Sequence, residues 1–281
     1  MSTQRVYLDH AASTPLDDRV LDEMLPLLRS AYGNPSSVHE HGRRLKAKIE
    51  VARKQIADLV GCAPAEIVFT SGGTEADNYA LQCALRDHRV KRIVSSPLEH
   101  HAVLNTVEYL EKTQGIERLM VNTDHGGRVD LEHLRTLLQH EDKTLVSLMH
   151  ANNEIGTLLD LEAVGELCKT HNVLFHTDTV QSIGLYNLNL TDLPVHYTAA
   201  SAHKFNGPRG IGFMYVESGY ACEPLIWGGA QERNQRGGTE NVAAIVGMAK
   251  ALELTYEQLD EKRQYLGELK AHMLKGLREL F

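Results

Sequence analysis

Two residues of complementary chemistry follow apolar segments of this 281-residue sequence. Asp178 comes shortly after the apolar run at 173–175, and Lys204 comes shortly after the segment at 197–201. An amine and an acid that emerge from neighbouring strand ends can mount an aldehyde cofactor together. The amine forms a Schiff base with the aldehyde, and the acid keeps the ring nitrogen protonated, as in the binding of pyridoxal phosphate (PLP). The pair predicts a PLP site if the remaining parts of such a site are present.

Short apolar segments alternate with helical patterns along the chain. Strands are predicted at 66–70, 91–95, 144–149, 173–175, 197–200 and 212–216, and helices at 43–60, 74–85, 101–113, 160–171 and 253–281. This alternation favours an α/β fold with an open, mainly parallel sheet flanked by helices. In such sheets ligands bind beyond the carboxyl ends of the strands. Asp178 and Lys204 are both expected there.

The segment 70–75 (Thr-Ser-Gly-Gly-Thr-Glu) lies between a predicted strand and a predicted helix. Backbone N–H groups at a helix start bind phosphate, Gly73 permits close backbone approach, and Thr74 can cap the helix while donating its hydroxyl. When the segment is taken alone, an ordinary capped strand-to-helix turn is the better explanation. The segment has neither the GK[ST] ending of a P-loop nor the dinucleotide-binding GxGxxG pattern.

Three further polar residues follow separate predicted strands. His100 begins a helix, where it can stack on a cofactor ring and take part in proton transfer. Asn153 follows the strand at 144–149 and Gln181 follows Asp178, and each amide can bind a ring hydroxyl. A solvated histidine and ordinary loop amides are the alternatives for each residue alone. Their shared position relative to the strands favours a single site.

Composition excludes several classes of function. Asp and Glu number 37 against 29 Lys and Arg, and the resulting net charge of −8 argues against a nucleic-acid-binding surface. The sequence has no run long enough for a membrane span and no signal-peptide pattern, which predicts a cytoplasmic protein. The fifteen histidines are scattered, so no metal site is predicted. Widely separated cysteines predict free thiols in a reducing compartment; they are Cys62, Cys83, Cys168 and Cys222.

These segments together resemble the class V, fold-type I PLP enzymes, and within them the cysteine desulfurases of the IscS/NifS group. The matching segments are YLDHAASTP (7–15), GNPSSVHEHG (33–42), VFTSGGTEADN (68–78), EHHAV (99–103), MHANNEIG (149–156), HTDTVQS (176–182), SAHKFNGPRGIG (201–212) and QRGGTEN (235–241). The resemblance implies a large PLP-binding domain with a seven-stranded type of sheet. It also implies conversion of L-cysteine to L-alanine, with sulfur passed as a persulfide to an acceptor or scaffold protein for iron–sulfur cluster assembly or thiolation.

The resemblance also implies individual roles. Lys204 would form the Schiff base, Asp178 would contact the pyridine nitrogen and His100 would stack on the ring, so Lys204 and His100 are the predicted catalytic residues. The remaining predicted contacts are Gln181 and Asn153 on the ring hydroxyl, Gly73, Thr74, Ser201 and His203 on the phosphate, and Thr239 on the phosphate of a partner subunit. The last contact implies a homodimer.

The pattern departs from the family toward the C-terminus. In the family the sulfur-accepting cysteine and the arginine that binds the substrate carboxylate lie beyond the position of residue 281, and none of the four cysteines here occupies an equivalent position. Cys222, near the loop at 227–228, is the one cysteine whose distance from the cofactor is worth checking. The sequence is therefore predicted to be truncated, with an N-terminal arm at 1–15, a PLP-binding domain at 16–252, and a linking helix with the start of an incomplete C-terminal domain at 253–281. Turnover is left open. The alternatives are another class V lyase or aminotransferase, or a PLP-binding fragment without turnover.

Overall fold

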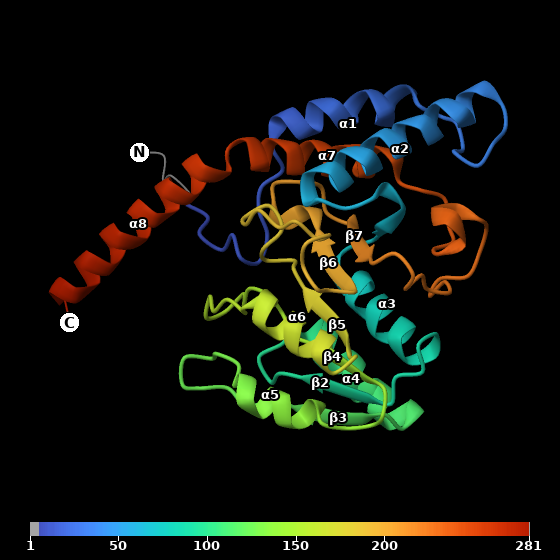
Figure 1. Ribbon diagram of the computed structural model, residues 1–281. Coiled ribbons are helices and arrows are strands. Elements are labelled where there is room, and N and C mark those ends of the chain that lie inside the picture. The colour runs from blue at the N-terminus through green and yellow to red at the C-terminus, as the bar shows by residue number, and fades with distance from the viewer. Residues whose placement is uncertain (1–5, 281) are drawn as a thin grey trace.

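A seven-stranded sheet in the order β1-β7-β6-β5-β4-β2-β3 lies at the centre of the computed structural model, which describes residues 6–280 (Figure 1). The strands are β1 Ile67–Thr70, β2 Arg92–Ser95, β3 Glu117–Met120, β4 Thr144–Ser147, β5 Leu174–Asp178, β6 Tyr197–Ser201 and β7 Gly212–Val216. Strand β7 runs antiparallel to both of its neighbours, β1 and β6, and the other pairs are parallel. The predicted mainly parallel α/β sheet is confirmed.

Helices connect the strands and cover both faces of the sheet. They are α1 Asp18–Ser30, α2 Glu40–Val60, α3 Gly73–Arg86, α4 His101–Gln114, α5 Leu131–Leu138, α6 Leu161–Thr170, α7 Val242–Glu257 and α8 Leu259–Leu280, with short 3₁₀ turns η1 Pro64–Glu66, η2 Ala202–Lys204 and η3 Gln231–Asn234. Local signals explain several boundaries. Asp130 and Asp160 accept N–H groups at the starts of α5 and α6, and Gly61 ends α2 in the left-handed conformation.

Successive residues of the central strands contribute to different apolar clusters. On β6, Ala199 packs in a cluster with residues of α3, whereas Ala200 packs in a larger cluster with residues of α2, α6 and α7. Side chains alternate between the two faces of a strand. A strand that is covered on both faces therefore has a continuous run of apolar residues in its sequence. This double burial fixes the carboxyl ends of β5 and β6 in a rigid frame.

Three elements were not predicted from the sequence, α1, β3 and α5, and the part of α7 before residue 253 was not predicted either. Strand β3 consists of Glu-Arg-Leu-Met at the edge of the sheet, where its residues are exposed or half-buried. Such a strand has no apolar run to reveal it, because none of its side chains is fully buried; β1, at the other edge of the sheet, is buried and apolar. Helix α5 has eight residues, which is too short for a strong periodic signal.

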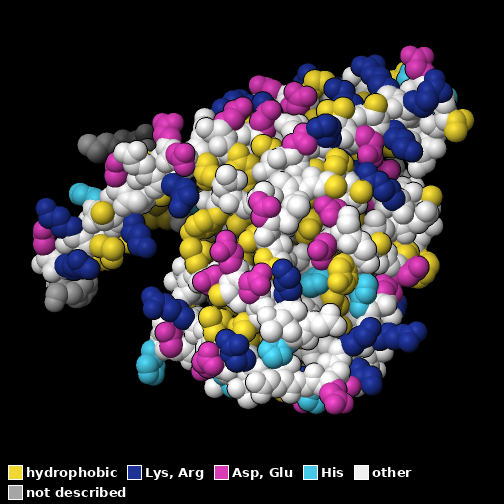
Figure 2. Space-filling model, viewed as in Figure 1, with side chains coloured by type: hydrophobic (Ala, Val, Ile, Leu, Met, Phe, Trp, Pro, Cys, Tyr) yellow, Lys and Arg dark blue, Asp and Glu magenta, His cyan; other side chains and the backbone are white. Residues whose placement is uncertain are grey.

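The C-terminal segment is two helices, so the prediction of one helical pattern over 253–281 is wrong. Helix α7 spans the predicted boundary at 252 and ends at Glu257, and the backbone of the following Gln258 is not helical. Gly267 and Gly276 lie inside α8 without interrupting it. Helix α8 projects from the body of the molecule with exposed apolar side chains, among them Tyr265 and Met273 (Figures 1 and 2). No helix in the described part of the chain is both long and apolar enough to cross a membrane.

Candidate functional site

A cavity of about 790 Å³ opens where the carboxyl ends of β5 and β6 meet the start of α3. Its volume lies in the range of small-molecule and cofactor sites. Every predicted site residue except Thr239 lines it; these are Gly73, Thr74, His100, Asn153, Asp178, Gln181, Ser201, His203 and Lys204. The fold therefore assembles residues that are spread over more than a hundred positions of the sequence.

The amine and the acid occupy adjacent strand ends. Asp178 is the last residue of β5, and Lys204 ends the η2 turn that directly follows β6. The two strands are parallel, with Asp178 opposite Ala199. Parallel neighbouring strands end at the same edge of a sheet, which is why both side chains reach one cavity.

Lys204 is half-buried and held by the N-terminal arm. Its Nζ donates to the carbonyl oxygens of Ala11 and, at 3.1 Å, of Ala12. Burial lowers the pKa of Lys204, and the carboxylates of Asp178 and Asp9 oppose that shift. A lowered pKa increases the fraction of neutral amine, which is the nucleophilic form required for Schiff-base chemistry.

Asp178 is 5% exposed, and its Oδ1 accepts the N–H of Val180 at 2.8 Å. Burial, followed by the nearby carboxylate of Asp77, raises the pKa of Asp178 to about 7. A cationic N–H group placed against this side chain would favour its charged form. The carboxyl group is therefore suited to hold a protonated ring nitrogen.

The start of α3 has the features of an anion cradle. Gly72 occupies the N-cap position with φ of 152°, and a Cβ on Gly73 would lie 2.5 Å from Cγ2 of Val180. No side chain in the described part of the chain caps this helix, so the cap predicted for Thr74 is wrong. Its first N–H groups have no intrahelical partner and can serve a phosphate. Together with Ser201 and Lys204, this donor set fits PLP.

The other predicted ring contacts have defined local partners. His100 caps α4, and its Nδ1 accepts the N–H of Ala102 at 3.1 Å, which places the proton of the neutral ring on Nε2. Gln181 donates to the carbonyl of Ala11 at 2.8 Å, and Asn153 donates to Oε1 of Glu154 at 2.7 Å. Each of the three side chains is thus oriented by a hydrogen bond at the wall of the cavity.

Sequence reasoning missed several residues that line the cavity. Asp9 and Ser13 come from the arm, Arg209 follows η2, and Asp77 is a buried carboxyl group on α3. Ser13 accepts from Arg209 at 3.1 Å and pairs with Nδ1 of His203 at 3.2 Å. The segment YLDHAASTP contains the arm residues, but nothing in its local pattern indicates that it folds over the strand ends.

The structure leaves the expectation for Thr239 untested and overturns the one for two of the cysteines. Thr239 is exposed and does not line the cavity of its own chain, so its contact with a partner subunit stays a prediction. Cys83 and Cys222 form a disulfide across 139 residues, so the prediction of free thiols is wrong for both, and Cys222 does not line the cavity. Spacing could not reveal this pairing because it depends on how the segment after β7 packs on α3. Cys62 and Cys168 are free.

Comparisons with known proteins agree with this geometry. The family described as "Aminotransferase class-V" matches residues 6–280. The "Putative cysteine desulfurase IscS 1" of Bacillus subtilis (strain 168) is 43% identical over 98% of this chain and 73% of its own length. The "Cysteine desulfurase IscS" of Dictyoglomus turgidum is 43% identical over 97% of this chain and 69% of its own length.

Solved structures are also similar. One named "NIFS-LIKE PROTEIN" superposes with a TM-score of 0.95 at 43% identity, over 99% of this chain and 76% of that one. Another, "SspA in complex with cysteine", has a TM-score of 0.84 at 34% identity, over 89% of this chain and 72% of that one. The chain belongs to the class V aminotransferase family and, within it, to the PLP-dependent cysteine desulfurases of the IscS/NifS group.

Proposed function

We propose that the cavity at the ends of β5 and β6 is where this chain holds PLP and removes sulfur from L-cysteine. The observation that carries the proposal is the arrangement of Lys204 and Asp178 on adjacent strand ends, in one cavity with the start of α3. A strand-end lysine or a helix start alone has many explanations. Here an amine, a buried acid and an anion-binding helix start surround one cavity. They match the aldehyde, the ring nitrogen and the phosphate of PLP, in that order.

The two strand-end residues have complementary tasks. When bound, PLP supplies an electron-withdrawing ring that stabilises negative charge on the substrate carbon. Lys204 provides the amine that anchors the aldehyde, and its lowered pKa favours the neutral, reactive form. Asp178 holds the proton on the ring nitrogen, and its burial excludes water from that contact.

The remaining cavity residues bind and orient. The start of α3 at Gly73 and Thr74, with Ser201 and His203, binds the phosphate. Asn153 and Gln181 bind the ring hydroxyl. His100 lies on the ring face and, with its proton on Nε2, can transfer that proton to or from the substrate. These assignments account for every predicted residue that lines the cavity.

The sulfur atom needs a separate acceptor. Removing sulfur from cysteine requires a thiolate that attacks Sγ. Among the described residues that line the cavity, none is a cysteine. We therefore propose that the accepting thiolate comes from outside residues 6–280, from another segment or from an acceptor protein that serves iron–sulfur cluster assembly or thiolation. A homodimer, with Thr239 reaching the partner's phosphate, and a cytoplasmic location belong to the same proposal.

The proposal is tested by reconstituting the protein with PLP and supplying L-cysteine with a small dithiol as sulfur acceptor. We expect visible absorbance from a lysine-bound cofactor, and equal amounts of alanine and sulfide. The Lys204→Ala variant should lose both the absorbance and the products. Formation of a keto acid in place of alanine would identify an aminotransferase. A cofactor spectrum without any product would identify a PLP-binding protein without turnover.

A further inference from the structure

Side chains along one face of α3, called the stripe below, bond the segment between β7 and α7, residues 217–241. The stripe consists of Glu75, Tyr79 and Cys83 of α3 together with Asp87, which directly follows the helix. The four residues are spaced four apart and lie on one face. Their partners in the segment, in order from the start of the helix, are Arg236 for Glu75, Gln235 for Tyr79, Cys222 for Cys83 and Glu223 for Asp87. Cys83 and Cys222 make the single covalent bond in this stripe, and both are buried.

The same stripe reaches the cofactor cavity at its N-terminal end. Glu75 lines the cavity, and its Oε1 lies 3.0 Å from Nε of Arg236. The other carboxylate oxygen of Glu75 accepts the N–H of Ser71 at 2.8 Å, within the turn that begins the anion cradle. A shift of the 217–241 segment would therefore move Arg236, and through Glu75 it would move the turn that begins the anion cradle.

The two halves of the segment are tied together. The N–H of Gly237 donates to the carbonyl oxygen of Ile226 at 2.8 Å, and a Cβ on Gly237 would lie 2.6 Å from the backbone nitrogen of Gly228. A restraint at Cys222 is thus transmitted to Arg236 over a short packed stretch. Glu232 attaches the segment to α2 separately, through its buried ion pair with Arg53. Loss of the disulfide should therefore increase the mobility of the segment while this ion pair keeps it bound to the fold.

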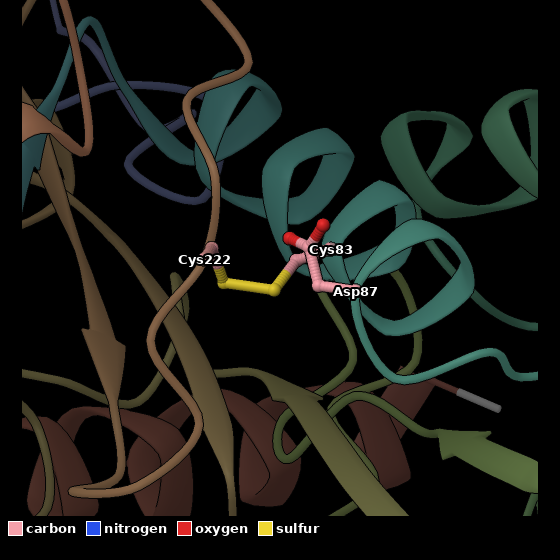
Figure 3. Close-up of side chains that lie close together, drawn as sticks. All are labelled: Cys83, Asp87 and Cys222. Atoms are coloured by element: carbon pink, nitrogen blue, oxygen red, sulfur yellow. A yellow bond between two sulfur atoms is a disulfide. The ribbon is translucent and has the colours of Figure 1, made fainter.

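Asp87 lies beside the two sulfurs (Figure 3), and one of its carboxylate oxygens is within 4.8 Å of both. Two thiolates and a carboxylate could form a metal site after reduction. The carboxylate is already occupied, because it accepts from Arg86 at 2.7 and 2.8 Å and from the N–H of Glu223 at 3.0 Å. The guanidinium of Arg86 also opposes a cation here. The geometry favours a disulfide over a metal site.

We infer that Cys83 and Cys222 form a reversible redox site that staples the 217–241 segment to α3 and controls how firmly the cavity holds PLP. A dithiol reductant would donate two electrons and two protons, break the Sγ–Sγ bond to give two thiols, and become a cyclic disulfide itself. Cys83 is fully buried, so the reductant reaches the bond only when the segment opens. Bound PLP should make reduction less favourable at equilibrium, since the coupling free energy between two sites is reciprocal. The link to PLP rests on the proposed function.

The staple is tested first without cofactor, by hydrogen exchange of peptides from 217–241. We expect exchange in this segment to be about tenfold faster or more in the reduced protein and in the Cys83→Ser/Cys222→Ser variant than in the oxidised protein. The Cys62→Ser variant, which changes a free cysteine, is the matched control. If the double variant fails to fold, the reduced unmodified protein and Cys222→Ser alone provide the comparison.

The link to the cavity is tested by PLP titration of the same samples. Reduction and the double substitution should each weaken PLP binding about fivefold or more, and saturating PLP should lower the equilibrium constant for reduction of the disulfide by the same factor, measured in dithiol redox buffers. Three results would contradict the proposed disulfide restraint. They are four free thiols after treatment with oxidised glutathione, a stoichiometric bound metal, and hydrogen exchange in 217–241 that does not change on reduction. Faster exchange with unchanged PLP affinity would overturn its link to the cavity. If no sample binds PLP, the proposed function fails while the exchange data still decide the staple.

Discussion

The imidazole Nε2 of His176 lies 3.4 Å from Oδ1 of Asp77, and both side chains are buried within electrostatic reach of Asp178. Burial raises the pKa of Asp77 to about 8 and lowers the pKa of His176 to about 4. At neutral pH the pair is therefore a protonated acid beside an uncharged imidazole. Neither atom has a hydrogen-bond partner elsewhere among residues 6–280. The protonated carboxyl group of Asp77 can donate a hydrogen bond to Nε2 of His176.

The stability of the cofactor-free protein should fall as the pH rises from about 6.5 to about 8. Burial raises the pKa of Asp77 to about 8 and that of Asp178 to about 7, so the folded state retains protons that the unfolded state has lost. Buried histidines with pKa lowered to about 4 have the opposite effect, but only below their unfolded pKa of about 6.5. Denaturant titrations across this window check the slope. A flat or rising stability would contradict it.

Replacing Asp77 by Asn should reduce that fall. The amide cannot ionise, and its N–H₂ can still donate to His176. We expect Asp77→Asn to gain stability at both pH values, by about 2 kcal/mol more at pH 8 than at pH 6, because the unfolded carboxyl group ionises from about pH 4 upward while the folded one stays protonated to about pH 8. The exposed carboxyl group of Asp58 provides the control as Asp58→Asn. Equal effects of Asp77→Asn at both pH values would show that the buried charge is not the cause.

The Lys204→Ala variant should bind PLP without the visible absorbance of a lysine-bound cofactor, and its activity should fall at least about 10²-fold. Lys204 is half-buried and contributes two hydrogen bonds to arm carbonyls, so its loss should cost no more than about 1–2 kcal/mol of stability. Absorbance spectra and denaturation curves measure the two effects separately. The exposed Lys169, as Lys169→Ala, should change neither. Retention of the absorbance band would exclude Lys204 as the anchor.

Removal of Arg53 should destabilise the fold by about 3–5 kcal/mol, because it leaves the carboxylate of Glu232 buried without its cation. Arg53 is 2% exposed and bonds both oxygens of Glu232, at 2.7 and 2.8 Å. The neighbouring Lys54 forms an exposed pair with Asp58, and Lys54→Ala should cost less than about 1 kcal/mol. Equilibrium unfolding of Arg53→Ala and Lys54→Ala makes the comparison. Similar costs for both variants would contradict the buried pair's importance.

A methyl group at Gly73 should weaken phosphate binding. The added Cβ would lie 2.5 Å from Cγ2 of Val180, so either the start of α3 or the Val180 side chain must shift, at a cost of about 1–3 kcal/mol. We expect Gly73→Ala to raise the PLP dissociation constant about tenfold, measured by titration. Gly276 in α8 faces open space, and Gly276→Ala should leave binding unchanged while raising helix stability slightly. Unchanged PLP affinity in Gly73→Ala would place the phosphate elsewhere.

Patterns that are local in the sequence predicted the elements and their ends. Apolar runs identified the buried strands, and the glycines at 72 and 73 identified the turn into α3. Strand β3 was missed because its side chains are exposed or half-buried and form no apolar run. The break at Gln258 was missed because the helical periodicity continues on both sides of it. These failures arise where tertiary surroundings, rather than local periodicity, decide the backbone.

The sequence by itself determined which residues reach the site: Lys204, Asp178 and Gly73 stand at element ends, and parallel strands bring their carboxyl ends to one edge. Only the tertiary structure decided what surrounds them. The arm carbonyls on Lys204, the pairing of Asp77 with His176, and the Cys83–Cys222 disulfide join segments that are far apart in the chain. Such contacts depend on the path of every element between them, which no local spacing records.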